Sequence, residues 1–286
     1  MPAEQIASNL ALINWTVLAG LAVGAFAVVV VTRLRTGATK GYLAFTALCA
    51  AALGVLAYLS DTALPVPAAT ASLVAGGSPI ITDPAWDGAR RAALLAFVVL
   101  AVATMVQVAR GRRGVVPGIA GCTAGFAALA LGGLTWGGAI GGALLLTVQL
   151  VVLALATGGV FAAMILGHWY LVTPKLPEAP LIMVSRGLMG VVALQVVLFV
   201  AWVGLGAGPG ATGGPFAALF GPWALFVWLR LLVGLVFPLV VSWAAVQTAK
   251  SRSMESATGL LYINVGTIAS GTILAAGLYF GAGLLV

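Results

Sequence analysis

Charged side chains are scarce in this chain. Only 7% of its 286 residues are Asp, Glu, Lys or Arg, whereas 62% are hydrophobic. An average soluble domain has about 25% charged residues, so six acids and thirteen bases are too few to solvate one of this size. The scarcity excludes a soluble globular protein, a disordered chain and a coiled coil, and it predicts an all-α polytopic integral membrane protein in contact with the lipid bilayer.

Histidine and cysteine are almost absent too. His168 is the only histidine, which excludes a bis-histidine haem within the chain. Cys49 and Cys122 lie inside apolar runs and do not form a disulfide framework or a zinc-type cluster. None of the common catalytic or phosphate-binding motifs occurs. We therefore expect no metal and no intrinsic cofactor, and we expect the chain not to be catalytic on its own.

Apolar runs long enough to cross a bilayer, about 20 residues each, are abundant. A seven-helix alternative would merge the fourth and fifth runs across residues 132–142 into a segment too long for one crossing. No basic region precedes the first run, so we expect it to be a retained span and not a cleaved signal peptide. The sequence predicts eight transmembrane helices, at 12–32, 41–60, 91–109, 115–135, 142–172, 181–206, 217–248 and 257–284.

Basic residues cluster in alternate connections. Because cytoplasmic loops carry excess Lys and Arg, these connections are predicted to face the cytoplasm of a bacterial-type inner membrane, with both termini outside. The net charge of +7 is then a topology signal, and no soluble face remains for nucleic acid. Ten of the thirteen bases follow this pattern: Arg33, Arg35, Lys40, Arg110, Arg112, Arg113, Lys175, Arg186, Lys250 and Arg252.

A weak internal repeat divides the chain into halves at 1–137 and 138–286. Arg90 and Arg230 match at an offset of 140, and the residues after them match in part. A real duplication predicts two four-helix halves in a parallel repeat, although low-complexity helices also match by chance. Residues 61–90 are predicted to form the largest extracytoplasmic loop, either a plain connector or a cap that serves as a lid or docking surface.

The densest polar cluster lies at the predicted cytoplasmic end of the fifth and sixth helices. A stiff turn with three prolines joins these helices and favours convergence of the flanking side chains. A cationic pocket with aromatic walls there would suit a quinone head group, an anionic lipid or an organic anion. The alternative is an interfacial aromatic belt with snorkelling bases. The candidate ligand-binding residues are His168, Trp169, Tyr170, Lys175, Ser185 and Arg186.

Arg230 lies inside the seventh predicted helix, where an ionised side chain is a functional-site hypothesis. No Asp or Glu falls within a predicted span to pair with it, so the alternatives are structural anchoring and a role toward a ligand or partner. Pro238 is expected to kink this helix. Gln149 and Thr157 share one face of the fifth helix, which lines either a cleft or a buried seam.

Two functions remain open. The first is an integral membrane subunit of a larger, respiratory or electron-transfer complex, with other subunits as partners and a small amphiphilic ligand, a quinone or lipid, at the cytoplasmic interface. Its plan resembles that of the NrfD/DmsC-type anchors of respiratory oxidoreductases, in architecture alone. The alternative is a transporter or exporter of a small organic anion or a lipid-like molecule.

Overall fold

The computed structural model describes residues 2–64, 80, 82–173, 175–211 and 213–286, and this part of the chain is helical without strands. The helices follow the apolar runs because a helix satisfies its own backbone hydrogen bonds where lipid offers none. In order they are α1 (Pro2–Ser8), α2 (Leu10–Arg35), α3 (Lys40–Thr62), η1 (Pro84–Trp86), α4 (Asp87–Ala109), α5 (Val115–Trp136), α6 (Ile140–Val172), α7 (Ala179–Leu205), η2 (Ala217–Leu219), α8 (Ala224–Leu231), η3 (Leu232–Val236), α9 (Phe237–Lys250) and α10 (Met254–Ala282).

Eight helices of the described chain are long and apolar enough to cross a membrane, which confirms the predicted number. The seventh span combines α8, the π-helical turn η3 and α9. It begins at Ala224 and not at 217, because the segment before it forms turns and the short helix η2. The last helix ends at Ala282, where Gly283 takes a left-handed conformation with φ of 67° and turns the chain back.

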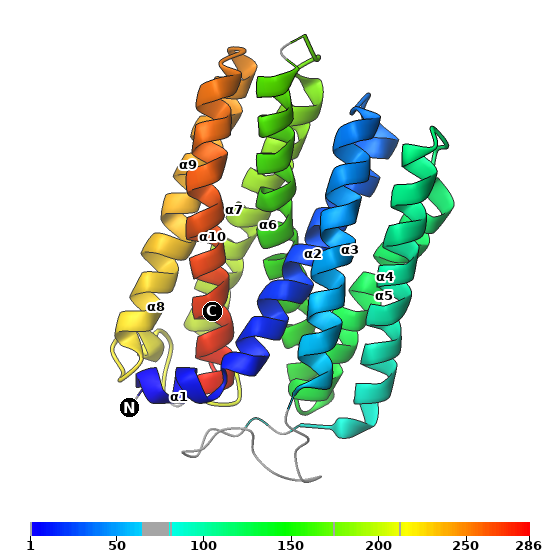
Figure 1. Ribbon diagram of the computed structural model, residues 1–286. Helices are drawn as coiled ribbons and strands as arrows, with labels where there is room; N and C mark the ends of the chain where they lie inside the picture. The colour runs from blue at the N-terminus through cyan, green and yellow to red at the C-terminus, as the bar shows by residue number, and fades with distance from the viewer. Residues whose placement is uncertain (1, 65–79, 81, 174, 212) are drawn as a thin grey trace.

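The spans pack as two four-helix rings (Figure 1). In the first ring α2, α3, α4 and α5 contact one another in that order, and α5 closes onto α2. In the second ring α6 contacts α7, α7 contacts α9, α9 contacts α10, and α10 closes onto α6. The rings meet mainly where α2 packs on α6. This arrangement has the form expected of two four-helix halves, and the duplication itself stays a prediction.

Glycines allow the close contact between the rings. A Cβ atom on Gly24 of α2 would lie 1.8 Å from the backbone oxygen of Ala154, and one on Gly158 of α6 would lie 2.2 Å from the backbone nitrogen of Ala25. Small residues at such a crossing permit the backbone packing that holds helices together in lipid. The α2–α6 contact therefore depends on these two positions.

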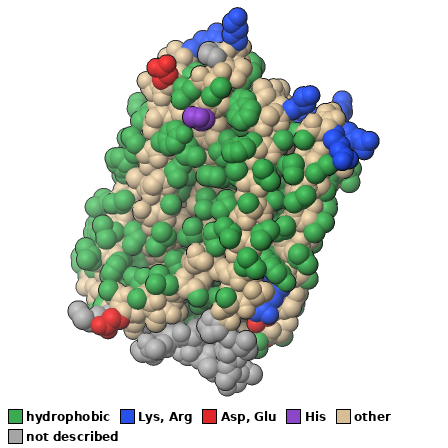
Figure 2. Space-filling model, in the orientation of Figure 1, with side chains coloured by type: hydrophobic (Ala, Val, Ile, Leu, Met, Phe, Trp, Pro, Cys, Tyr) green, Lys and Arg blue, Asp and Glu red, His purple; other side chains and the backbone are tan. Residues whose placement is uncertain are grey.

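The two ends of the bundle differ in charge (Figure 2). The end that carries the α2–α3, α4–α5, α6–α7 and α9–α10 connections holds most of the Lys and Arg side chains, and we call it the basic end. The opposite end carries Asp61, Asp83 and Asp87. Most of the predicted loop 61–90, namely 65–79 and 81, lies outside the described residues, so its interpretation as a cap stays a prediction.

Candidate functional site

Arg230 lies in the interior of the second ring and is only 2% exposed. It stands six residues after the start of α8, just before the helix widens into η3. Pro238 causes part of this local geometry: in a regular α-helix its N–H would bond to the carbonyl of Gly234, and proline has no N–H. The Arg230 Nη1 atom donates to that carbonyl at 3.2 Å. A helix irregularity thus supplies an acceptor for the buried cation.

Two glycines make room for the Arg230 guanidinium. Gly234 of η3 and Gly271 of α10 touch so closely that a Cβ on either would lie 2.6 Å from the Cα of the other. A Cβ on Gly271 would also lie 2.9 Å from Arg230 Nη1. The guanidinium therefore lies against the crossing of η3 and α10.

Two glutamines accompany Arg230. The Gln195 side chain of α7 accepts a hydrogen bond from Arg230 Nη2 at 3.3 Å, and its own Nε2 donates to the carbonyl of Val152 at 3.1 Å. Gln149 of α6 is 3% exposed. All three polar side chains line one small cavity of about 10 Å³, together with Val152, Leu153, Leu198, Trp202 and Val286. We call it the arginine cavity.

Two buried polar atoms of this cavity have no hydrogen-bond partner in the part of the chain that the structure describes. They are the Nε donor of Arg230 and the Oε1 acceptor of Gln149. No acidic side chain of the described residues forms an ion pair with Arg230, and the two oxygens that accept its hydrogen bonds are both neutral. Burial without a partner is costly for either atom. The cavity therefore offers an unused cationic donor and an unused acceptor to a small polar group.

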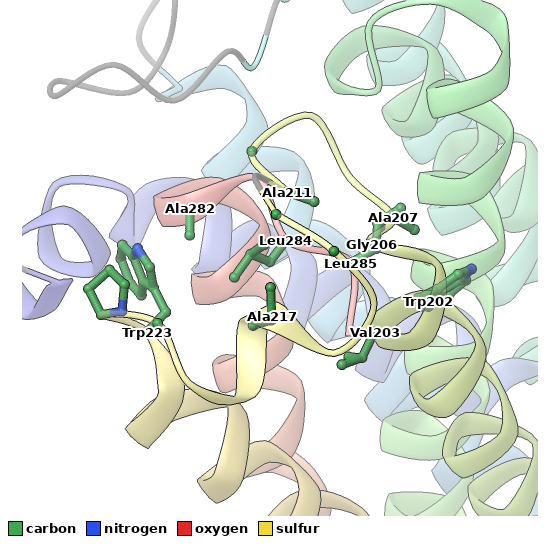
Figure 3. A pocket seen from close by; sticks show the side chains of 16 residues that line it. Trp202, Val203, Gly206, Ala207, Ala211, Ala217, Trp223, Ala282, Leu284 and Leu285 are labelled. Carbon is green, nitrogen blue, oxygen red and sulfur yellow. The ribbon is translucent and has the colours of Figure 1, made fainter.

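A surface depression of about 190 Å³ lies in the second ring at the end opposite to the basic end (Figure 3). Residues 283–286, which we call the strap, fold back into the ring: Gly210 donates to the carbonyl of Gly283 at 3.1 Å, and Leu285 donates to that of Ala207 at 3.2 Å. Leu284 and Leu285 line the depression, whereas Val286 lines the arginine cavity. Trp202 lines both, so the strap and this indole lie between the two spaces.

Further polar pairs follow the interior of the second ring toward the basic end. The hydroxyls of Thr157 and Thr272 are 2.6 Å apart between α6 and α10. Asn264 donates to the Ser242 hydroxyl at 2.8 Å between α10 and α9. The polar face predicted on the fifth helix therefore has both roles: Thr157 lies in a helix seam, and Gln149 borders a cavity.

The structure places the side chains of three consecutive cluster residues against three different parts of the protein. His168 Nδ1 lies 3.4 Å from the Tyr262 hydroxyl of α10. The Trp169 ring lies 6.5 Å from that of Phe45 on α3. The Tyr170 hydroxyl donates to the carbonyl of Pro177 in the α6–α7 connection. Successive helical residues diverge by about 100°, and the three side chains accordingly do not converge.

The other three predicted cluster residues differ in exposure. Lys175 and Arg186 are exposed, whereas Ser185 is 1% exposed and its hydroxyl has no partner. Among the described residues, no hydrogen bond or ring contact joins two members of the cluster. The cluster as a ligand site stays a prediction.

A second arginine, Arg90, is buried and holds several helices together, which was not expected from the sequence. Arg90 of α4 is 1% exposed and donates to both carboxyl oxygens of Asp61, at 2.6 and 3.1 Å. It also bonds Asp87 at 2.7 Å and the Thr135 hydroxyl at 2.8 Å, and its Cζ lies 4.5 Å from the centre of the Trp136 ring. The sequence signal for this centre was the match of Arg90 to Arg230.

The eight apolar spans define the class: this is a multi-pass membrane protein. Neither a protein-family model, nor a curated protein, nor a solved structure matches the chain. The side chains of the chain itself are therefore the guide to its function. In the arginine cavity, Arg230 Nε and Gln149 Oε1 have no partner among the described residues and are free to bind a ligand.

Proposed function

We propose that the protein carries a small organic anion across the membrane through its second ring, with Arg230 as the anion-binding residue. One observation supports this above all: a guanidinium 2% exposed, without a carboxylate partner in the described chain, borders a cavity with one donor unused. An unpaired buried charge is strongly unfavourable. An anion beside Arg230 would supply the missing charge.

The Gln149 oxygen, which has no partner among the described residues, favours an anion that also carries a hydrogen-bond donor. An acceptor is satisfied only by a donor, and a simple halide has none. A small oxyacid that carries both ionised and protonated oxygens satisfies Arg230 Nε and Gln149 Oε1 together. A water molecule that accompanies a carboxylate meets the same requirement.

Passage requires movement, because a cavity of about 10 Å³ holds no more than about one water molecule. The strap and Trp202 lie between it and the outer depression, so they are the groups to be displaced on that side. The π-helical turn η3 before Pro238 provides a place where the seventh span can bend. The paired polar residues Thr157 and Thr272 continue the route toward the basic end.

The test is uptake by purified protein in liposomes, with radiolabelled acetate, lactate, benzoate and phosphate as substrates. We expect uptake of at least one carboxylate, abolished by Arg230→Gln. Lys250→Gln is the control, since it removes a positive charge from an exposed position of the same ring. Absence of flux across the panel, or equal loss in both variants, would contradict the proposal.

We further propose that the basic end faces the cytoplasm of a bacterial-type membrane, with the N-terminal residues on the outer side, because cytoplasmic loops are enriched in Lys and Arg. Single cysteines at position 113 and at position 141, each introduced into a variant with Cys49 and Cys122 replaced by alanine, probe the two ends in spheroplasts. A membrane-impermeant maleimide should label the cysteine at 141 and leave that at 113 unlabelled. The reverse pattern would invert the orientation.

A second candidate function is a membrane subunit of an electron-transfer complex that binds a quinone at the basic end. The exposed His168–Tyr262 pair favours it, since an imidazole and a phenol are suitable partners for quinone carbonyls. Native mass spectrometry of protein extracted in mild detergent reports partner chains and bound quinone together. His168→Ala should release the quinone and Lys250→Gln should not; a lone chain without quinone would exclude this function.

A further inference from the structure

The basic end of the first ring carries an unusual concentration of arginine. Six bases lie there, and no acidic residue of the described chain forms an ion pair with any of them. The two acidic residues at the basic end, Glu178 and Glu255, belong to the second ring, where Glu178 pairs with Arg252 at 3.3 Å. The bases are Arg33, Arg35, Lys40, Arg110, Arg112 and Arg113.

Arg33 fixes the geometry of this surface. Its Nε donates to the carbonyl of Arg113 at 3.1 Å, and its Nη2 donates to that of Arg112 at 3.4 Å. The end of α2 is thereby tied to the connection between α4 and α5. These bonds use backbone oxygens, so the side chains of Arg112 and Arg113 stay exposed.

An apolar crevice opens directly beneath Arg33. It lies between α2, α4 and the start of α5, and its own volume is only about 10 Å³, as small as that of the arginine cavity; the space open to the surroundings brings the total to about 240 Å³, so it is a shallow groove along which a chain can lie. Gly118 keeps part of this space open, because a Cβ there would lie 3.2 Å from the Val30 side chain. Its wall is apolar except for Arg33 and Thr104, and the other lining residues are Val29, Val30, Leu34, Val108, Gly114, Val115 and Gly118.

We propose that this surface binds one anionic phospholipid, with the phosphate against Arg33, Arg112 and Arg113 and part of an acyl chain in the crevice. Charge complementarity selects an anion, and the apolar crevice next to the charge selects an amphiphile over a free ion. Basic pockets between transmembrane helices are suited to anionic head groups. The site is separate from the arginine cavity of the second ring and does not depend on transport.

Native mass spectrometry tests the proposal on the full chain in mild detergent, with phosphatidylglycerol and phosphatidylcholine of identical acyl chains added in equal amounts. We expect the wild type to retain the anionic lipid preferentially. Arg112→Gln with Arg113→Gln should lower that preference roughly fivefold for each charge removed. The variant keeps the backbone carbonyls that Arg33 uses, so the local fold is preserved.

Two further variants make the test specific. Lys250→Gln removes a charge from the basic end of the second ring and should leave the preference unchanged. Val115→Phe fills the crevice without changing charge and should reduce retention of phosphatidylglycerol. The proposal would be overturned if the wild type retained both lipids equally, or if the lysine control lost the preference as the arginine variant does. It would also be overturned if Val115→Phe retained phosphatidylglycerol fully, or if inorganic phosphate displaced the lipid.

Discussion

The two buried arginines of this protein occupy similar places and have opposite surroundings. Arg90 and Arg230 both belong to the third span of their own ring, and both are at most 2% exposed. Arg90 has two carboxylates, a hydroxyl and an indole face around it. Among the described residues, Arg230 has only a backbone carbonyl and a glutamine oxygen as acceptors, at 3.2 and 3.3 Å, and one of its donors has no partner.

This difference fits a structural role for Arg90 and supports the anion-binding role that we propose for Arg230. A guanidinium forked onto a carboxylate uses its donors in the geometry that suits it best, so Arg90 has little left for a ligand. Asp61 also accepts from Arg91 at 2.8 Å and joins α3 firmly to α4. Arg230 carries the same charge with neutral partners, and a charge held in this way is available to an anion. The same residue type thus closes one end of the first ring and forms the candidate site of the second.

Asp61→Asn should cause the largest loss of stability among the variants that test this comparison. It leaves Arg90 buried with one carboxylate fewer, and removal of one member of a buried ion pair costs about 3–5 kcal/mol. Thermal unfolding in detergent, followed by circular dichroism, measures the loss of stability. Asp83→Asn is the control, because Asp83 is exposed and its carboxylate only caps the turn at Ala85. Equal stability of the two variants would show that the Arg90 centre is not a structural one.

Gly234→Ala should have the next largest effect. The new Cβ would lie 2.6 Å from the Cα of Gly271, so η3 and α10 must separate, and overpacking of this kind costs about 1–3 kcal/mol. Unfolding temperature and anion uptake should fall together, since the guanidinium lies against this contact. Gly266→Ala serves as the control on α10, where a Cβ meets no atom within 4 Å. A normal unfolding temperature for Gly234→Ala would contradict the close crossing.

Arg230→Met should have the smallest effect on stability and a full effect on function. Methionine fills much of the same space, and replacement of an uncompensated buried charge by an apolar side chain is close to neutral or stabilising. Arg90→Met, by contrast, leaves Asp87 without its cation and the buried Asp61 with Arg91 alone, so its unfolding temperature should fall by several degrees. Unfolding temperatures of both variants, compared with anion uptake, separate the two roles. A larger loss of stability in Arg230→Met than in Arg90→Met would reverse the comparison.

Pro238 shows which part of the arginine cavity could be predicted from the sequence. Its sequence position predicted a kink in the seventh span, and the structure has a π-helical turn just before it. That this turn presents a carbonyl to Arg230, and that Gly271 of another helix makes the room, depends on packing between distant segments. The cluster around His168 illustrates the opposite case. Adjacent positions suggested convergence, and rotation about the helix axis turned the side chains toward α10, α3 and the α6–α7 connection.

The sequence by itself determined the membrane class, the number of spans and the gathering of bases at one end. Each depends on the composition and length of single segments, because transfer into lipid is decided residue by residue. Tertiary structure alone decided which arginine meets carboxylates, and that the strap folds back beside the arginine cavity. The reason is geometric: partners from α3, α7 and α10 reach an arginine only after the helices have fixed their rotation and depth against one another.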